Sequence, residues 1–378
     1  MPQTPDRQVA IRVGCIGVGG QGHFDMREVG RHAQVAAICD IDAAALAEAA
    51  RLFPEARTFS DHRELIEDGS LDAVTISVPD HQHAPIALRA LAAGLHCHCQ
   101  KPMATSIADV HEMSRAAAGS GRRTQVSLDG LAHARAWQAI EAIQAGALGE
   151  VEEVHAWTDR PGPHWDPLAE PDPTPAPDGF DWEGWLGSSD YEGAYRPWTL
   201  PRQWRGWRAF GTGALGDLGT HNCALAFAAL GVRGAPLAVE GEWGRAPSDR
   251  FPPWSQLRFE LRTESGGALT MHWYDGGRQP PVDLFEDVRR DGNGCLIVGT
   301  RGRCYLPGSM NEYVYFLPRR RFADLRLPPP REVPGVVADW LRACATGGAT
   351  ALPFDGVAAA IAEAMLAGNR ATESARAR

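Results

Sequence analysis

The stretch VAIRVGCIGVGGQG, residues 9–22, decides the fold of this 378-residue chain. Its apolar, β-branched first half predicts a strand, and its glycine-rich second half predicts a tight turn that opens a helix. In such a turn Gly17 permits the sharp bend, Gly19 lets the backbone approach a pyrophosphate, and Gly22 lets the helix pack against the strand. The helix N-terminus adds unpaired N–H groups and the positive end of a dipole, which favour phosphates. The residues predicted to form this cofactor-binding turn are Gly17, Gly19, Gly20, Gln21 and Gly22.

A second strand-like run at residues 34–39 ends in Asp40, eighteen residues after Gly22. At this spacing an acidic side chain can bind both ribose hydroxyls of an adenosine and repel a 2′-phosphate. A G-x-G-x-x-G match alone is weak, but here the strand, the helix and the distant carboxylate form one consistent unit. We therefore predict a dinucleotide site rather than a chance glycine loop, with NAD preferred over NADP.

Strand-like and helical runs alternate from residue 11 to about residue 127. The predicted strands are residues 11–16, 34–39, 72–78, 95–99 and 123–127. The predicted helices are residues 21–31, 42–52, 60–68, 83–93 and 106–119. This alternation is typical of the α/β class with a doubly wound parallel sheet, and it predicts a Rossmann domain over residues 1–128.

The remainder, residues 129–378, is predicted to form a second domain. A helix is expected at 134–146 and a strand at 151–157, followed by a long ordered loop at 159–203. Alternating apolar and polar positions then predict a largely antiparallel sheet. Its expected strands are residues 237–243, 255–263, 267–274, 294–299 and 302–306. Helical patterns at 334–345 and 354–370 close the chain.

Composition and charge exclude several classes of function. Apolar residues make up 44% and charged residues 22% of the chain, as in an ordinary globular enzyme. The net charge of −10 argues against nucleic acid or an anionic membrane as a partner. No apolar run reaches the roughly 20 residues of a membrane span, and the first ten residues lack the apolar core of a signal peptide. The eight cysteines form no C-x-x-C pair, so we expect a reduced, cytoplasmic protein with a small-molecule substrate.

The run His96-Cys97-His98-Cys99 contains residue types that can ligate a metal. Consecutive side chains of a strand point to opposite faces, so at most one His pair or one Cys pair converges there. The spacing also matches no zinc pattern. We therefore expect no metal site.

Two polar turns follow predicted strands at the edge where open α/β sheets bind their ligands. One is VPDHQH, residues 78–83, and the other is QKP, residues 100–102. A third motif, GALGDLGTH at residues 213–221, lies in the second domain. Together with the glycine turn, these motifs resemble the Gfo/Idh/MocA oxidoreductase family, whose members carry P-x-x-x-H, E-K-P and D-x-x-x-H motifs at these places. The resemblance covers nearly the whole chain.

The resemblance implies a Rossmann domain followed by an α/β domain whose open, mainly antiparallel sheet serves substrate binding and oligomerisation. It also implies hydride exchange between a nicotinamide and a hydroxyl-bearing carbon, usually of a sugar or cyclitol. By position, Lys101 would lie near the nicotinamide and the reacting hydroxyl, His221 would be the general base, and Asp217 would bind or orient the substrate. Besides Lys101, the residues implied to border the cofactor are Pro79, His83 and Gln100. Since relatives pair through the second sheet, a homodimer or homotetramer is expected.

Elementary chemistry supports these roles. Oxidation of an alcohol carbon also requires loss of the hydroxyl proton, and an imidazole with an ordinary pKa of about 6.5 suits that transfer. Asp217 and His221 are four residues apart and would share one helix face, where a plain surface ion pair is the alternative. For Lys101 the alternative is a solvated lysine at a strand end, and for His83 it is a histidine at a helix start.

Gln100 departs from the family pattern, which has glutamate at this place. A carboxylate there would hold Lys101 in its charged form, whereas a neutral amide would not. We therefore expect Lys101 to lose its proton more readily than in relatives, or to act mainly as a hydrogen-bond donor.

Residues 157–207 contain more than half of the twelve tryptophans. Aromatic rings suit the apolar faces of sugars, but they also support irregular segments as buried side chains. We expect the second role for most of them, with Trp165 and Trp204 lining the substrate pocket.

Three arginines, Arg202, Arg205 and Arg208, precede the Asp217 motif. They could bind an anionic group of the substrate through paired hydrogen bonds, or they could pair with the many carboxylates of the chain. Pairing with carboxylates is the favoured interpretation, and Arg205 is kept as a candidate substrate contact.

The leading functional prediction is an NAD-dependent oxidoreductase acting on a sugar, glycoside or cyclitol. The alternative is an NAD-dependent glycosidase that oxidises a ring hydroxyl transiently and releases the aglycone without net redox change. Such an enzyme needs a further acid or base, for which Tyr191, Tyr195 and His164 are candidates. A non-catalytic NAD-binding regulator is less consistent with the retained Lys101 and His221 motifs.

Overall fold

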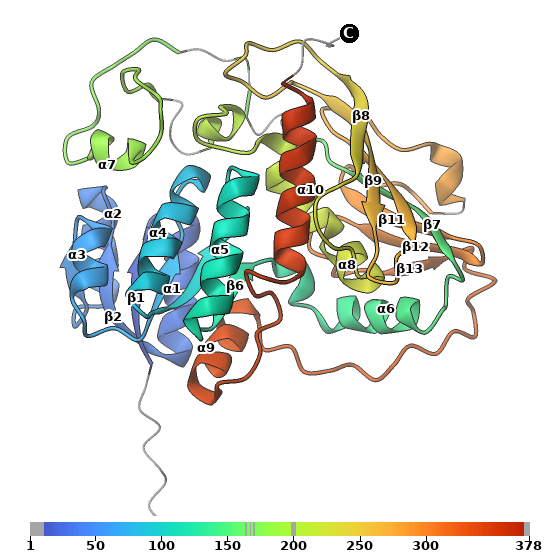
Figure 1. The fold of residues 1–378 in the computed structure, drawn as a ribbon, viewed down its shortest axis with the longest axis horizontal. Coiled ribbons are helices and arrows are strands. Elements are labelled where there is room, and N and C mark those ends of the chain that lie inside the picture. Colours follow the sequence, from blue (N-terminus) through green and yellow to red (C-terminus); the bar gives the residue numbers. More distant parts are fainter. Residues whose placement is uncertain are drawn as a thin grey trace, which may run out of the picture.

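The computed structural model describes residues 11–162, 165–166, 168, 171–197, 202–286 and 288–373. It contains two sheets with helices on their faces, and Figure 1 shows the unit built on the first sheet beside the unit built on the second. The two units share a continuous apolar core that includes Val74 of the first and Phe259 of the second. No described helix has the length and apolar character that crossing a membrane requires.

The first unit is a six-stranded parallel sheet in the order β3-β2-β1-β4-β5-β6. Its strands are β1 (Arg12–Ile16), β2 (Gln34–Cys39), β3 (Arg57–Phe59), β4 (Ala73–Ile76), β5 (His96–Gln100) and β6 (Thr124–Ser127). Its helices are α1 (Gly20–His32), α2 (Ala43–Leu52), α3 (His62–Glu67), α4 (Asp80–Ala92) and α5 (Ile107–Ser120). The predicted doubly wound sheet is confirmed. The short edge strand β3 was not predicted, because its three residues are too few to show a period.

The second unit is a seven-stranded sheet in the order β13-β12-β11-β7-β10-β9-β8. Its strands are β7 (Val151–Trp157), β8 (Ala238–Trp243), β9 (Ser255–Arg262), β10 (Ala268–Tyr274), β11 (Gly294–Gly299), β12 (Gly302–Pro307) and β13 (Tyr315–Leu317). Its helices are α6 (Ala134–Gln144), α7 (Trp182–Leu186), α8 (Thr220–Leu230) and α10 (Val357–Ala371). All strand pairs are antiparallel except β7 with β10, so the expectation of a mainly antiparallel sheet holds.

Helix α10 stands between the two units and packs against α5 of the first and α8 of the second (Figure 1). Its alanine-rich sequence buries Ala358, Ile361 and Met365, and small side chains allow its backbone to approach its neighbours closely. The helix is buried on nearly all sides between Ala358 and Asn369. Helix α10 therefore fixes the position of α8, which carries part of the candidate site.

Helix α9 (Val336–Thr346) returns to the first unit after the second sheet is complete. Val337 and Trp340 are buried in one apolar cluster with Met26 and Val29 of α1. The indole N–H of Trp340 donates to the carbonyl of Arg123 at 3.1 Å. The expected domain limit at residue 128 stays a prediction, and the structure adds that the chain crosses back to the first unit near its end.

A segment that we call the strap, residues 179–191, runs from the second unit across the first. Figure 1 shows its helix α7 above α2. The backbone of the strap pairs with the residues after β2, because Asp181 N–H donates to the carbonyl of Ile41 at 3.0 Å and Ala43 N–H donates to that of Gly179 at 2.9 Å. At its other end, Nε2 of His81 lies 3.0 Å from the carbonyl oxygen of Trp185. The strap thus joins the carboxyl ends of β2 and β4.

Candidate active site

The glycine turn has the geometry that dinucleotide binding requires. Gly17 has φ +77°, and a Cβ there would lie 2.4 Å from the carbonyl oxygen of Ser77. A Cβ on Gly22 would lie 1.9 Å from the carbonyl oxygen of Gly17, so the helix approaches the strand closely. By contrast, no atom lies within 4 Å of a Cβ built on Gly20, which leaves open space beside the start of α1. The turn and helix N-terminus therefore fit the pyrophosphate of NAD.

Asp40 lies directly after β2, where the ribose of an adenosine is expected. Its Oδ2 accepts hydrogen bonds from the backbone N–H groups of Val18 at 2.8 Å and Gly19 at 3.2 Å. Burial raises the pKa of Asp40, and these backbone hydrogen bonds oppose the rise. The carboxylate is thereby fixed against the glycine turn, in a position to contact ribose hydroxyls.

A buried carboxylate, Asp25 of α1, organises the floor of this region. Asp25 Oδ2 accepts from Ser77 Oγ at 2.6 Å and from Gln100 Nε2 at 2.8 Å. Gln21 Nε2 donates to the other oxygen at 3.2 Å. Gln21 and Gln100, both expected to border the cofactor, are therefore held by a buried carboxylate of α1.

Lys101 lies between the two units and contacts Asp217. Its Nζ donates to the carbonyl oxygen of Asp217 at 2.9 Å and also forms an ion pair with Asp217 Oδ1. Arg205 adds a second cation, because its Nε lies 3.5 Å from the same Oδ1. Burial alone would raise the pKa of Asp217, but Lys101 and Arg205 outweigh it and hold that pKa well below its usual value. A carboxylate from another element thus replaces the neighbour that the family pattern has at position 100.

The D-x-x-x-H motif lies on a π-helical turn that leads into α8. Residues Leu215–Gly219 form this turn, and His221 is the second residue of α8. Such turns widen the helix and are frequent at functional sites. Here the carbonyl of Asp217 accepts a hydrogen bond from Lys101 in addition to the carboxylate contact. Asp217 and His221 lie close together, as predicted. The turn that carries Asp217 is π-helical, which the four-residue spacing does not reveal.

His221 is buried, and its Nδ1 has no hydrogen-bond partner among the described residues. Burial, together with the positive charge of Lys101, lowers the pKa of His221 to about 3. The ring is therefore neutral at physiological pH, with a lone pair able to accept a proton.

Asp80, the first residue of α4, is a further buried carboxyl in this region. Its Oδ2 accepts from Thr212 Oγ1 at 2.9 Å. Burial raises the pKa of Asp80 to about 7, against the opposing effects of Arg205 and Lys101. Asp80 lies within the VPDHQH turn, and the position of this turn at a ligand-binding edge could have marked Asp80 as a site residue. Its partner Thr212 lies far away in the sequence and could not be found in this way.

Pro79 and His83 shape the turn that begins α4. Pro79 precedes the first residue of that helix. The ring of His83 is buried between two carbonyls, with Nδ1 at 2.7 Å from Pro102 O and Nε2 at 2.9 Å from Val78 O. Burial lowers the pKa of His83 to about 4. The neutral ring packs between the turn after β4 and the turn after β5 and donates to one of the two carbonyls, so it supports the cofactor region from behind.

The aromatic residues of the long loop mostly form a buried cluster. Trp185, Trp204, Trp207 and Phe210 are its buried members. Trp204 carries the guanidinium of Arg205 over its ring at 4.2 Å. Trp165 is also buried and lies 5.7 Å from the guanidinium carbon of Arg160.

The three arginines before the Asp217 motif separate into different environments. Arg205 contacts Asp217, whereas Arg208 donates to the backbone of Arg250 and to Thr372, so Arg208 anchors the end of the chain. Arg202 is exposed.

Two of the three candidates for an additional acid or base lie at the aromatic cluster. Tyr191 packs within the cluster and Tyr195 contacts Phe180 and Trp182. His164 lies outside the described residues. Within the described part of the chain, no three metal-ligating side chains of the His, Cys, Asp or Glu type come together.

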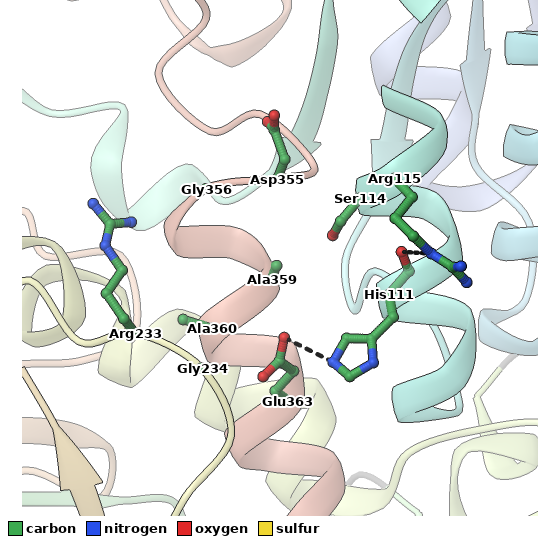
Figure 2. Close-up of a pocket in the computed structure, with 10 residues that line it drawn as sticks. All are labelled: His111, Ser114, Arg115, Arg233, Gly234, Asp355, Gly356, Ala359, Ala360 and Glu363. Atoms are coloured by element: carbon green, nitrogen blue, oxygen red, sulfur yellow. Dashed lines mark hydrogen bonds and ion pairs between the residues drawn. The ribbon is translucent and has the colours of Figure 1, made fainter. Parts of the chain in front are cut away.

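A surface cavity of about 590 Å³ lies between α5 and α10 (Figure 2). His111 Nε2 on α5 lies 3.3 Å from Glu363 Oε1 on α10, and Arg115 and Arg233 also line the cavity. None of the predicted site residues lines it. The cavity is therefore separate from the candidate active site.

Comparison with known proteins identifies the class of this fold and site. Residues 11–128 match the model of an oxidoreductase family with an NAD-binding Rossmann fold. This match covers the NAD-binding unit and agrees with the resemblance to the Gfo/Idh/MocA oxidoreductases seen in the motifs. NAD is therefore the cofactor type of the first unit.

Two curated relatives indicate the range of the family. Levoglucosan dehydrogenase of Pseudarthrobacter phenanthrenivorans is 27% identical over 250 residues, which cover 64% of this chain and 51% of that protein. Inositol 2-dehydrogenase of Paracoccus denitrificans is 34% identical over 120 residues, which cover 30% of this chain and 35% of that protein. The chain thus spans about half the length of the first relative and about a third of the second. The solved structure of levoglucosan dehydrogenase with NADH and levoglucosan has a TM-score of 0.63 at 20% identity, covers 96% of this chain and 98% of that chain, and shows a shared fold.

Proposed function

We propose that the chain is an NAD-dependent oxidoreductase that transfers a hydride between a nicotinamide and a hydroxyl-bearing carbon of a sugar, glycoside or cyclitol. The observation that carries this proposal is the meeting of Lys101, Asp217 and His221 at the carboxyl end of β5, beside an NAD-binding turn. The relatives support the substrate class, since levoglucosan is an anhydrosugar and inositol is a cyclitol.

The residues divide the work between binding and proton transfer. His221, neutral and with an unpaired Nδ1, accepts the proton of the reacting hydroxyl. Two of the three N–H donors of Lys101 contact Asp217. The third can bind the substrate oxygen and stabilise the negative charge that develops on it. Asp217 holds the Lys101 side chain in place and fixes its direction. NAD, when bound, supplies the hydride acceptor or donor.

A single assay tests the reaction type. The purified protein is incubated with NAD⁺ and a panel of sugars, cyclitols and nitrophenyl glycosides, while the absorbances of NADH and of released phenol are followed. We expect net NADH formation with at least one member of the panel. Phenol release without net NADH would overturn the proposal in favour of the redox-neutral glycosidase, and neither signal with any member would contradict both.

Replacement of His221 by alanine tests the assignment of the base. Because His221 belongs to the second unit, NADH binding should remain as in the unsubstituted protein, whereas kcat should fall by roughly 10²–10⁴-fold. Titration of NADH fluorescence and steady-state kinetics measure the two quantities. Full activity in this variant would refute the role of His221.

A further inference from the structure

The surroundings of Lys101 and Asp217 contain cations that the proposed hydride transfer does not use. Arg160 follows β7, whose last residue Trp157 accepts a hydrogen bond at its carbonyl from Nδ2 of Asn222 at 2.7 Å. Asn222 is the neighbour of His221, so Arg160 lies close to the start of α8. Its charge lowers the pKa of His221 and interacts with that of Asp217.

The guanidinium of Arg160 is partly buried, and a cation in such a place normally has a hydrogen-bonding partner. Its Nε atom is buried and makes no hydrogen bond to any described residue. No ion pair joins it to a carboxylate within the described ranges, although Asp159 and Asp217 are close enough to act on it electrostatically. Trp165 packs against the guanidinium at 5.7 Å and limits its movement. A fixed cation with unused donors is suited to receiving an anion.

Arg205 is a second cation within electrostatic range of Arg160. Its guanidinium is held over Trp204 at 4.2 Å, and its backbone is packed against Gly211, where a Cβ would lie 2.6 Å from the Arg205 Cα. A guanidinium has five N–H donors, and Arg205 uses one of them at 3.5 Å from Asp217. Arg160 and Arg205 repel each other electrostatically, and Arg202 adds to this repulsion.

We propose that Arg160 and Arg205 form a subsite for an anionic group, a carboxylate or a phosphate, on the sugar substrate. This inference rests on the proposed function, because it names the substrate class for the same site. An anion between the two guanidinium groups relieves their mutual repulsion and satisfies the unpaired Nε of Arg160. It also offsets part of the positive charge that keeps the His221 ring from accepting a proton. The enzyme is thus selective for acidic sugars over neutral ones.

The test compares three matched substrates, a neutral hexose, the corresponding hexuronic acid and the corresponding hexose phosphate. For the NADH-loaded protein, the dissociation constant of each is measured by calorimetry, and kcat/KM with NAD⁺ is measured in parallel. We expect one of the two acids to be favoured over the neutral hexose by tenfold or more in both quantities, with the preference falling at high salt. The acid that is favoured distinguishes a carboxylate from a phosphate.

The variant Arg160→Gln tests the subsite directly. The preference for the acid, taken as the ratio of the acid to the neutral hexose in each quantity, should fall roughly tenfold to a hundredfold. Arg160→Lys should restore part of the preference, because it keeps the charge and loses the planar fork. Arg258→Gln is the matched control, since it removes the same charge from an exposed strand position where Arg258 pairs with Glu240 and Glu260.

The possible results separate this inference from the proposed function. Turnover of neutral sugars with no preference for either acid overturns the subsite and leaves the oxidoreductase assignment standing. An unchanged acid preference in Arg160→Gln also overturns it. Acid binding that depends on Arg160, without NADH formation from any substrate, supports the subsite and contradicts the proposed reaction.

Discussion

Asp25 is a buried carboxylate that receives side-chain hydrogen bonds from Gln21, Ser77 and Gln100. All three partners donate, so the charge is well satisfied without a cation among them. A glutamate at position 100 could not donate to Asp25 and would place a second negative charge beside it. The amide at this position is therefore explained by its partner on α1.

This contact predicts the effect of Gln100→Glu. The variant brings two carboxylates together in a buried place, and we expect it to lower the free energy of unfolding at neutral pH by at least about 1–3 kcal/mol. The double variant Asp25→Asn with Gln100→Glu should recover most of the loss, because the amide and the carboxylate then exchange places. Denaturant unfolding of the four proteins in this cycle measures the coupling. Equal stability of Gln100→Glu and the unsubstituted protein would exclude the proposed contact.

Asp80 predicts a pH dependence of stability. Its pKa rises from the ordinary 3.8 to about 7 on burial, so the folded protein retains a proton that the unfolded chain releases between these values. Stability therefore falls as pH increases through this window, by up to about 4 kcal/mol from this group. Asp80→Asn removes the titration while its amide oxygen still accepts from Thr212. Unfolding free energies of the two proteins across this pH range should diverge in slope, and parallel curves would contradict the assignment.

At the scale of elements, the π-helical turn Leu215–Gly219 decides the geometry of the site. Its fit depends on Gly216, where a Cβ would lie 2.2 Å from both Cβ and Oγ1 of Thr212. Thr212 in turn donates to Asp80 and accepts at its carbonyl from Asn369 of α10 at 2.7 Å. The turn that carries Asp217 is thus braced from both units.

Gly216→Ala should disturb this turn. Because the added methyl group collides with Thr212, we expect kcat/KM to fall at least tenfold while NADH binding is retained. Gly119→Ala is the control, since Gly119 is a helical glycine of α5 with open space around its Cα. If Gly216→Ala has the activity of the control, the turn does not set the position of Asp217.

Motifs and periodicity were sufficient for the parallel sheet and the glycine turn. They also singled out Lys101, Asp217 and His221, which lie close together in the structure and stay predicted site residues. They were insufficient for contacts between segments far apart in the chain. Asp80 with Thr212 and Gln100 with Asp25 are separated by 132 and 75 positions, and neither pair has a local pattern. Arg160 was missed because a lone arginine after a strand gives no signal until its surroundings are known.

At the scale of the whole molecule, the side chains of the second sheet decide what kind of interface two copies of the chain could form on it. The alternating apolar residues of β9 and β10, such as Leu257, Phe259 and Met271, face the helices and belong to the common core. The intervening residues Gln256, Glu260 and Arg262 are exposed. The apolar alternation is thus explained within one chain, and an interface on these strands would be polar.

We still expect a homodimer or homotetramer formed through this sheet, as the resemblance to the family implies. Light scattering at micromolar concentration measures the assembled mass. If the interface on β9 and β10 is polar, the assembly should also weaken as salt is added. A monomeric mass at low salt would contradict this expectation.

The strap has a thermodynamic consequence. It pairs with Ile41, the residue after Asp40, and it belongs to the same loop as Arg205. When two ligands influence each other's binding to one protein, each changes the affinity for the other by the same factor. If the sugar favours one arrangement of this loop, sugar binding raises the affinity for the nucleotide. Nucleotide binding then raises the affinity for the sugar by the same factor. Cofactor affinity in this protein then depends on the carbohydrate present, and a dissociation constant for NADH describes the protein only together with the sugar at which it was measured.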